Sequence, residues 1–221
     1  MWANKGPYTT PVADETPLPL PLPEPPAFGD PVLQPSSPEV LHFLARRRSV
    51  SAVNLQGPAP SPAELDALLR IAVRVPDHGK LSPWRFVVLS GEAKVEATAR
   101  LEALAAGRGD ARSVAKLIKL KTPPMAVAVV SRARPGLDIP EWEQQLSAGA
   151  VCTLLLIGAQ AMGYGANWIT DWYSYDAEAR TILGLAPDER VAGMVMLGTA
   201  KEPPLERERP DAAALTSIWR P

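Results

Sequence analysis

Apolar residues recur along this chain with the periods of helices and strands. The clearest helix follows Ser61 and Glu64, which form a capping box before apolar positions spaced i, i+3, i+4, i+7 and i+8. Ser37 followed by Pro38 supplies an N-cap and a first-turn proline, which predict an earlier helix. Further helices are expected over residues 92–106, 110–121, 140–162 and 176–183.

Short apolar runs between these helices predict strands. Each run is bounded by prolines, glycines or polar loops and is too brief for a helix. The elements show no internal repeat, and no glycine-rich phosphate loop follows a strand, which argues against a Rossmann domain or a P-loop enzyme. The predicted strands span residues 86–89, 125–130, 166–170 and 191–197.

Proline divides the chain into an N-terminal extension, residues 1–36, and a single domain, residues 37–221. In the extension proline alternates with leucine and small polar residues, which favours extended backbone with little to bury. We expect this segment to be disordered. It could act as a spacer or as a ligand for a proline-recognition domain.

Charge and cysteine content exclude several classes of function. The net charge of −1 provides no strong field for nucleic acid or an anionic membrane, so neither is an expected partner. The single cysteine, Cys152, lies in an apolar run and is expected to be buried and inert.

No secretory leader pattern is visible, and the longest apolar stretch, residues 148–162, is too short to span a membrane. A cytoplasmic location is therefore expected.

A run of basic residues closes the first predicted helix and is the first candidate site. Arg46, Arg47, Arg48 and Ser49 offer three guanidinium groups and a hydroxyl, which suit a phosphate. The alternative is that cations at a helix C-terminus are favoured by the helix dipole alone.

Two further clusters lie in predicted loops or at strand ends. Arg74 and His78 bracket a proline turn, where a rigid scaffold can present them to a ligand. Trp168 follows a glycine-rich turn and is either a core residue or a cofactor contact. Neither histidine has the partners of a metal site or a nucleophilic triad, so no metal site and no such triad is expected.

Together these features resemble the nitroreductase family over residues 41–210. Each marker is common alone, but all of them occur here in order and at the family's spacing. The markers are Arg47, Arg48 and Ser49, the segment from Arg74 to Phe86, the segment from Trp142 to Gly149, the turn at Gly163, Tyr164 and Gly165 with Trp168, and Leu197 with Gly198 and Thr199.

The resemblance implies an α+β fold with a central mixed β-sheet packed by helices. It also implies a homodimer that holds FMN at its interface, with the apolar residues 146–162 on an interface helix. The implied cofactor-binding residues are Arg47, Arg48 and Ser49 at the phosphate and ribityl end, Arg74 and His78 from the partner chain, and Trp168, Ile169 and Thr170 along the flavin.

Other parts of the resemblance leave alternatives open. Residues 158–163 match a stretch assigned to nicotinamide binding in relatives, but helix packing explains their small side chains equally well. Arg207 and Arg209 resemble a C-terminal basic pair that touches the phosphate in some relatives. Asp171 ends a segment where some relatives place a basic residue, which bears on the electron acceptor rather than on flavin binding.

The implied activity passes hydride from NADH or NADPH through FMN to a nitroaromatic, a quinone or a similar flat acceptor by a ping-pong mechanism. The flavin carries this chemistry, so the protein needs only to bind and orient. One alternative is another flavin reaction on the same fold, such as an enoate-type reduction or a dehalogenation. The other is a non-enzymatic binding protein recruited through the proline-rich extension.

Overall fold

The computed structural model describes residues 24–221 of the chain. The predicted disorder of residues 1–36 therefore falls largely on residues outside the described range. Residues 24–36 are all exposed and carry no helix or strand. Their one turn is closed by hydrogen bonds between Ala27 and Asp30.

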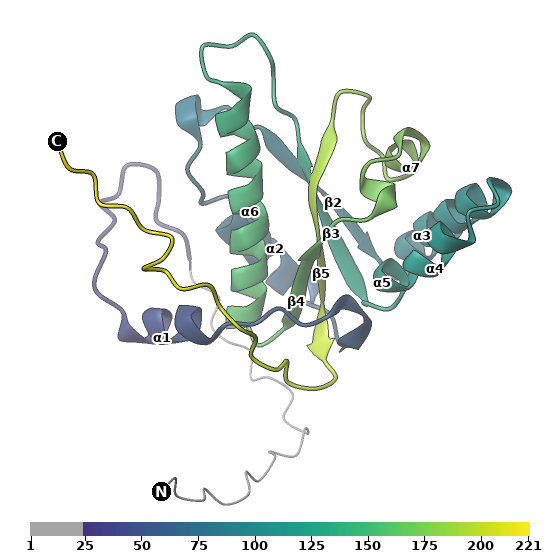
Figure 1. The fold of residues 1–221 in the computed structure, drawn as a ribbon, viewed down its shortest axis with the longest axis horizontal. Helices are drawn as coiled ribbons and strands as arrows, with labels where there is room; N and C mark the ends of the chain where they lie inside the picture. The colour runs from purple at the N-terminus through teal and green to yellow at the C-terminus, as the bar shows by residue number, and fades with distance from the viewer. Residues whose placement is uncertain (1–23) are drawn as a thin grey trace, which may run out of the picture.

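A five-stranded sheet forms the centre of the molecule (Figure 1). β5 is its longest strand and pairs with β3 on one side and with β4 and β1 on the other, while β2 pairs with the far side of β3. The strands are β1 (Leu55–Gln56), β2 (Trp84–Ser90), β3 (Met125–Ser131), β4 (Gly165–Ile169) and β5 (Arg190–Ala200).

The predicted mixed sheet was wrong for the described residues, in which every strand pairing is antiparallel. Between β2 and β3 the chain runs out along α3 (Gly91–Gly107) and back along α4 (Ala111–Lys116) and α5 (Ile118–Lys121). This return places the start of β3 where β2 ends, so the two strands run in opposite directions. α6 (Glu141–Ala161) is a single crossover that makes β4 run the same way as β3, but β5 lies between them.

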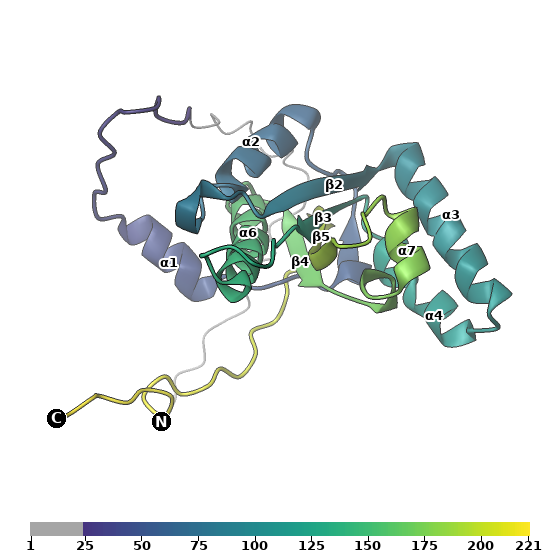
Figure 2. The same cartoon turned by 90° about the horizontal axis from the view of Figure 1, so that it is seen from above.

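Helices cover both faces of the sheet (Figure 2). α2 (Pro62–Ala72) and α6 pack on one face; α3, α4, α5 and α7 (Ala177–Ile182) lie on the other. β3 is buried along its whole length because Ala126, Ala128 and Val130 join one core cluster while Val127 and Val129 join the other. Burial on both faces explains why β3 reads as a continuous apolar run.

The predicted helix starts are confirmed by their caps. Ser37 accepts a hydrogen bond from the backbone of Val40 at the start of α1 (Pro38–Arg46). Ser61 and Glu64 form the reciprocal capping box of α2, with distances of 2.8 and 3.3 Å.

Two details were not predicted. The helix expected over residues 110–121 is divided into α4 and α5 at Leu117, where the backbone tightens to i to i+3 hydrogen bonds. β1 was missed because two residues are too few to show a period.

α6 ends in a tight turn at Gly163 and Tyr164. Gly163 has a φ of 86°, and the backbone nitrogens of Gly163 and Tyr164 donate to the oxygens of Gln160 and Ala159 at 3.0 and 2.9 Å. This is a Schellman motif, which confirms the predicted glycine stop. It fixes the last turn of α6 directly before β4.

Candidate functional site

The first group of candidate residues lies where α1 meets the last turn of α6. α1 ends at Arg46, so Arg47 and Arg48 are outside the helix. The Arg47 guanidinium donates from Nε to Oε1 of Gln160 and from Nη2 to Oγ of Ser49, each at 3.1 Å. Arg46 is in the last turn of α1 and Arg47 is its C-cap, so both lie at the negative end of the helix dipole, while Arg47 also makes specific side-chain hydrogen bonds.

Arg47, Arg48 and Arg209 form what we call the basic cluster. The Arg48 Nε donates to the backbone oxygen of Leu205 at 2.9 Å, and Arg209 donates to the backbone oxygen of Arg47 at 3.5 Å. Within residues 24–221, Glu206 is the one carboxylate in ion-pair range of the cluster, 3.1 Å from Arg209 and 3.8 Å from Arg48. Partial burial, followed by the nearby charges of Arg209 and Arg48, lowers the pKa of Arg47 from its ordinary value. Three guanidinium groups around one carboxylate favour the binding of an anion.

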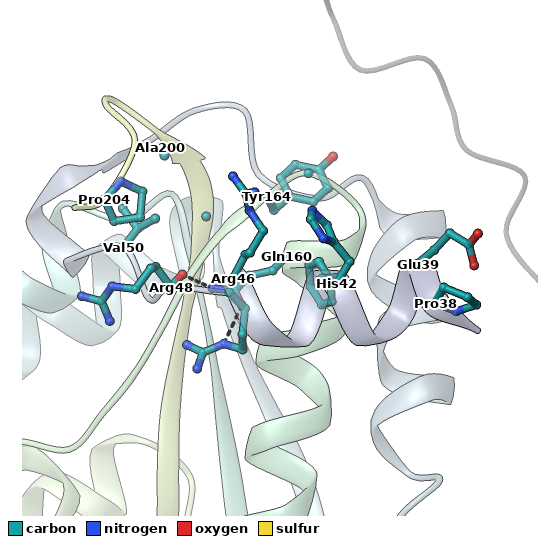
Figure 3. A pocket seen from close by; sticks show the side chains of 14 residues that line it. Pro38, Glu39, His42, Arg46, Arg48, Val50, Gln160, Tyr164, Ala200 and Pro204 are labelled. Carbon is teal, nitrogen blue, oxygen red and sulfur yellow. Dashed lines mark hydrogen bonds between the residues drawn. The ribbon is translucent and has the colours of Figure 1, made fainter. Parts of the chain in front are cut away.

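A pocket of about 880 Å³ opens beside the basic cluster. Figure 3 shows Arg46, Arg48 and Gln160 gathered where α1 approaches the end of α6. The volume is within the range of sites for cofactors and small molecules. The apolar part of the lining includes Phe43, Val50, Tyr164, Ala200 and Pro204.

The second group of candidate residues lies at the opposite end of α6. Nδ1 of His78 is 2.8 Å from Oε2 of Glu143, and both side chains are largely exposed. Ser147 of α6 holds the turn at Pro76 by a hydrogen bond from its Oγ to the backbone oxygen of Pro76 at 2.8 Å. The same Oγ accepts from Nε1 of Trp84 at 3.1 Å. Arg74 is exposed at the start of the same turn.

The length of α6 separates the two groups within one chain. Gln160 contacts the first group and Glu143 contacts the second. An α-helix rises about 1.5 Å per residue, so these two positions are about 25 Å apart along its axis. One chain therefore does not bring Arg47, Arg48 and Ser49 together with Arg74 and His78.

The third group lies at the end of β4, beside the middle of α6. Trp168 is 40% exposed, and its ring packs against Gly193 of β5 and Gly149 of α6. A Cβ at Gly193 would collide with the indole nitrogen, so the glycine makes room for this ring. One part of the Trp168 ring is therefore packed, and another part is accessible.

The neighbours of Trp168 have different environments. Ile169 packs against the core cluster on the far face of the sheet. The Thr170 hydroxyl is partly exposed and accepts a hydrogen bond from the hydroxyl of Tyr175 at 2.7 Å.

Comparison with known proteins assigns the arrangement to a family. The family model described as "Nitroreductase family" matches residues 44–199. The chain belongs to the nitroreductase family. This nitroreductase is 33% identical over 164 residues to the Escherichia coli (strain K12) protein named "Putative NAD(P)H nitroreductase YdjA", which covers 73% of this chain and 88% of the relative.

Solved structures share the fold. A nitroreductase-like family protein from Bacillus cereus superposes with a TM-score of 0.70 at 19% identity, over 84% of this chain and 98% of the other. A nitroreductase with bound FMN from Bacteroides fragilis NCTC 9343 superposes with a TM-score of 0.63 at 22% identity, over 83% of this chain and 100% of the other. These neighbours confirm the predicted α+β, nitroreductase-like fold.

Residues 158–163, for which nicotinamide binding and helix packing were both open, include one glycine that packs closely in this nitroreductase. A Cβ at Gly158 would lie 3.1 Å from Cδ2 of Leu68, so the glycine permits close contact between α6 and α2. Gln160 was missed from the sequence, although it is the one amide side chain in the apolar stretch 148–162, which was a signal for it. Its side chain contacts both Arg47 and Arg48.

Within residues 24–221, no helix of this nitroreductase combines the length and apolarity needed to span a membrane.

Proposed function

We propose that this protein is an FMN-dependent oxidoreductase that passes hydride from NADH or NADPH to a nitroaromatic, a quinone or a similar flat acceptor. The observation that carries the proposal is the basic cluster beside the 880 Å³ pocket. The name of the Escherichia coli relative and the FMN in the Bacteroides fragilis structure support it.

The residues present fit FMN. Guanidinium groups bind phosphate through paired hydrogen bonds, and the basic cluster has more positive charge than Glu206 neutralises. Arg47, Arg48 and Ser49 would hold the phosphate and ribityl end. The accessible part of Trp168 and the Thr170 hydroxyl would lie along the flavin ring, and Ile169 would contribute its backbone, because its side chain packs against the core on the far face of the sheet. Arg74 and His78 would reach the flavin of the partner chain.

When bound, FMN supplies the redox chemistry, taking a hydride from the nicotinamide and returning electrons to the acceptor. The chain's own residues would bind and orient: the basic cluster would fix the anionic end, and the Trp168 ring, 40% exposed, would border the space for flat substrates. We propose that NAD(P)H leaves before the acceptor enters the same space, which is a ping-pong order.

Apolar side chains left exposed in one chain support a homodimer. Trp142 and Leu146 on α6 are 66% and 53% exposed, and Val40 and Leu41 on α1 are 53% and 69% exposed. The expectation that residues 146–162 bury their apolar side chains in the interface needs correction. Val151, Cys152, Leu155, Leu156 and Ala159 are already buried against the chain's own sheet and α2.

An absorbance spectrum of the purified protein tests the proposed function. The preparation should be yellow, or become so with added FMN, and should bleach anaerobically when NADPH or NADH is added. A nitroaromatic or a quinone should then restore the colour, whereas recovery only with enoates or halogenated compounds would indicate another flavin reaction. A protein that neither retains nor takes up FMN would contradict the proposal.

Steady-state kinetics test the ping-pong order. Varying NAD(P)H at several fixed acceptor concentrations should give parallel lines in a double-reciprocal plot. Intersecting lines would indicate that NAD(P)H and the acceptor bind at the same time, which would contradict the ping-pong order.

A further inference from the structure

One neutral side chain joins the two central arginines of the site. Oε1 of Gln160 accepts from Nε of Arg47 at 3.1 Å, and Nε2 of Gln160 donates to the backbone oxygen of Arg48. A side-chain amide accepts at its oxygen and donates at its nitrogen, so the pair of bonds uses both functions of Gln160. Gln160 is partly buried in the last turn of α6.

The bonds of Arg47 are directed to one side of its guanidinium group. Nε donates to Gln160, and one hydrogen of Nη2 is donated to Ser49. Among residues 24–221 the group makes no other hydrogen bond, so its remaining hydrogens face no described partner and can serve a ligand. The contact through Nε thus holds the plane of the guanidinium without using the whole of its binding edge.

The neutrality of Gln160 matters as much as its geometry. A carboxylate at this position would pair with Arg47 and cancel the charge that an anion requires. The amide restrains the same group without that cancellation. Its helix turn is itself fixed by the Schellman motif at Gly163 and Tyr164, so the restraint comes from a rigid element.

We propose that Gln160 is a positioning residue that gives the site its selectivity for a phosphorylated flavin over riboflavin. The inference rests on the proposed FMN function and deepens it. Gln160 does not touch the phosphate; it orients the Arg47 guanidinium and fixes the backbone at Arg48, and these two residues bind the phosphate. Selectivity for the phosphate therefore depends on a residue 113 positions away along the chain from Arg47.

Two substitutions separate the roles of geometry and charge. Gln160→Met keeps the approximate size of the side chain and removes both hydrogen bonds. Gln160→Glu keeps an acceptor for Arg47, adds a negative charge and loses the donor to Arg48. Gln145→Met is the matched control, because Gln145 lies on the same helix and its amide bonds only to exposed Glu141 among the described residues.

The measurement is the dissociation constant for FMN and for riboflavin, by quenching of flavin fluorescence, on full-length protein freed of flavin. Both Gln160 variants should bind FMN about tenfold or more weakly, as the loss of about 1.4 kcal/mol implies, while riboflavin binding should stay near the wild-type value. Gln145→Met should keep the wild-type ratio of the two affinities. Thermal melting of each variant reports whether it is folded.

Failure of this inference can be told apart from failure of the proposed function. A folded variant that keeps the wild-type ratio of FMN to riboflavin affinity would overturn the role of Gln160. An equal loss of both affinities would also overturn it, because it would indicate a general structural effect. A wild-type protein that does not bind FMN would overturn both proposals.

Discussion

The guanidinium groups of Arg47 and Arg48 sit in a position suited to binding rather than to chemistry. Both are restrained by hydrogen bonds to Ser49, Gln160 and Leu205. Arg47→Ala and Arg48→Ala should each weaken FMN binding by about 1.5–3 kcal/mol, roughly ten- to hundredfold, through loss of a charge-assisted hydrogen bond.

FMN titration by fluorescence quenching measures this loss, and activity lost at low FMN should return when FMN is added in excess. Arg100→Ala is the control, because that arginine is exposed on α3 and pairs with Glu96. If both cluster variants bound FMN as tightly as the wild type, the basic cluster would not be the phosphate site.

Gly193 is a second residue whose effect is local. A methyl group there would collide with the Trp168 indole and lie 2.9 Å from Sγ of Cys152. Gly193→Ala should lower the free energy of unfolding by about 1–3 kcal/mol through overpacking, and it should also weaken FMN binding by displacing Trp168. Urea unfolding gives the first value and FMN titration the second.

Gly107→Ala is the matched control for this substitution. Gly107 is exposed at the end of α3, and an added Cβ meets nothing within 4 Å. That variant should be as stable as the wild type or more stable by up to about 1 kcal/mol. Equal stability of Gly193→Ala and the wild type would show that Trp168 is free to move.

At the scale of elements, local signals were sufficient for most helices and strands. The caps at Ser37 and Ser61 are completed within three residues, and the apolar run of β3 reflects burial by helices on both faces. The antiparallel order was not predictable in this way, since it depends on which strands become neighbours: β5, the last strand in the chain, lies between β3 and β4. Gln160 was missed for a similar reason, because its partners lie more than a hundred residues away.

An ion pair joins β2 to the turn before β5. Arg85 donates to both carboxylate oxygens of Glu189 at 2.6 and 2.5 Å, and the Glu189 side chain is 8% exposed. The hydrogen bonds from Arg85, above all, lower the pKa of Glu189 below its ordinary value of 4.5. Glu189→Gln should therefore lower the free energy of unfolding by about 2–3 kcal/mol at pH 7.

The pH dependence of this difference has a definite sign. Because the pKa of the folded state is lowered, the stabilisation is fully present above the unfolded value of 4.5 and is lost as the pH falls through the folded pKa. Urea unfolding at pH 7 and at pH 4 should show the gap between wild type and variant shrinking at the lower pH. Glu96→Gln, in an exposed helix pair, should cost under about 0.5 kcal/mol at either pH. A gap for Glu189→Gln that did not change with pH would contradict the assigned ion pair.

At the scale of the whole molecule, we expect the body, residues 37–221, to fold and bind FMN without the N-terminal extension. Residues 24–36 are exposed throughout. Deleting residues 1–36 should leave the melting temperature and the FMN content nearly unchanged, because a proline-rich segment has few backbone hydrogen bonds and little apolar burial. A fall in melting temperature of more than a few degrees would show that the extension packs on the body or on a second chain.

We propose that each flavin site is formed by Arg47, Arg48 and Ser49 of one chain together with Arg74 and His78 of a second copy. The protein should sediment at about twice its 23.7 kDa chain mass. A mixed dimer tests the claim most directly. It pairs a chain carrying Arg47→Ala and Arg48→Ala with a chain carrying Arg74→Ala and His78→Ala.

If each flavin site is shared between two chains, one site of the mixed dimer contains all four substitutions. The second flavin site then contains only wild-type residues. Purified through two different tags, the mixed dimer should bind one FMN with wild-type affinity, although neither parent homodimer does. If each site lay within a single chain, both sites of the mixed dimer would carry two substitutions. The mixed dimer would then bind FMN no more tightly than its parents, which would contradict the account.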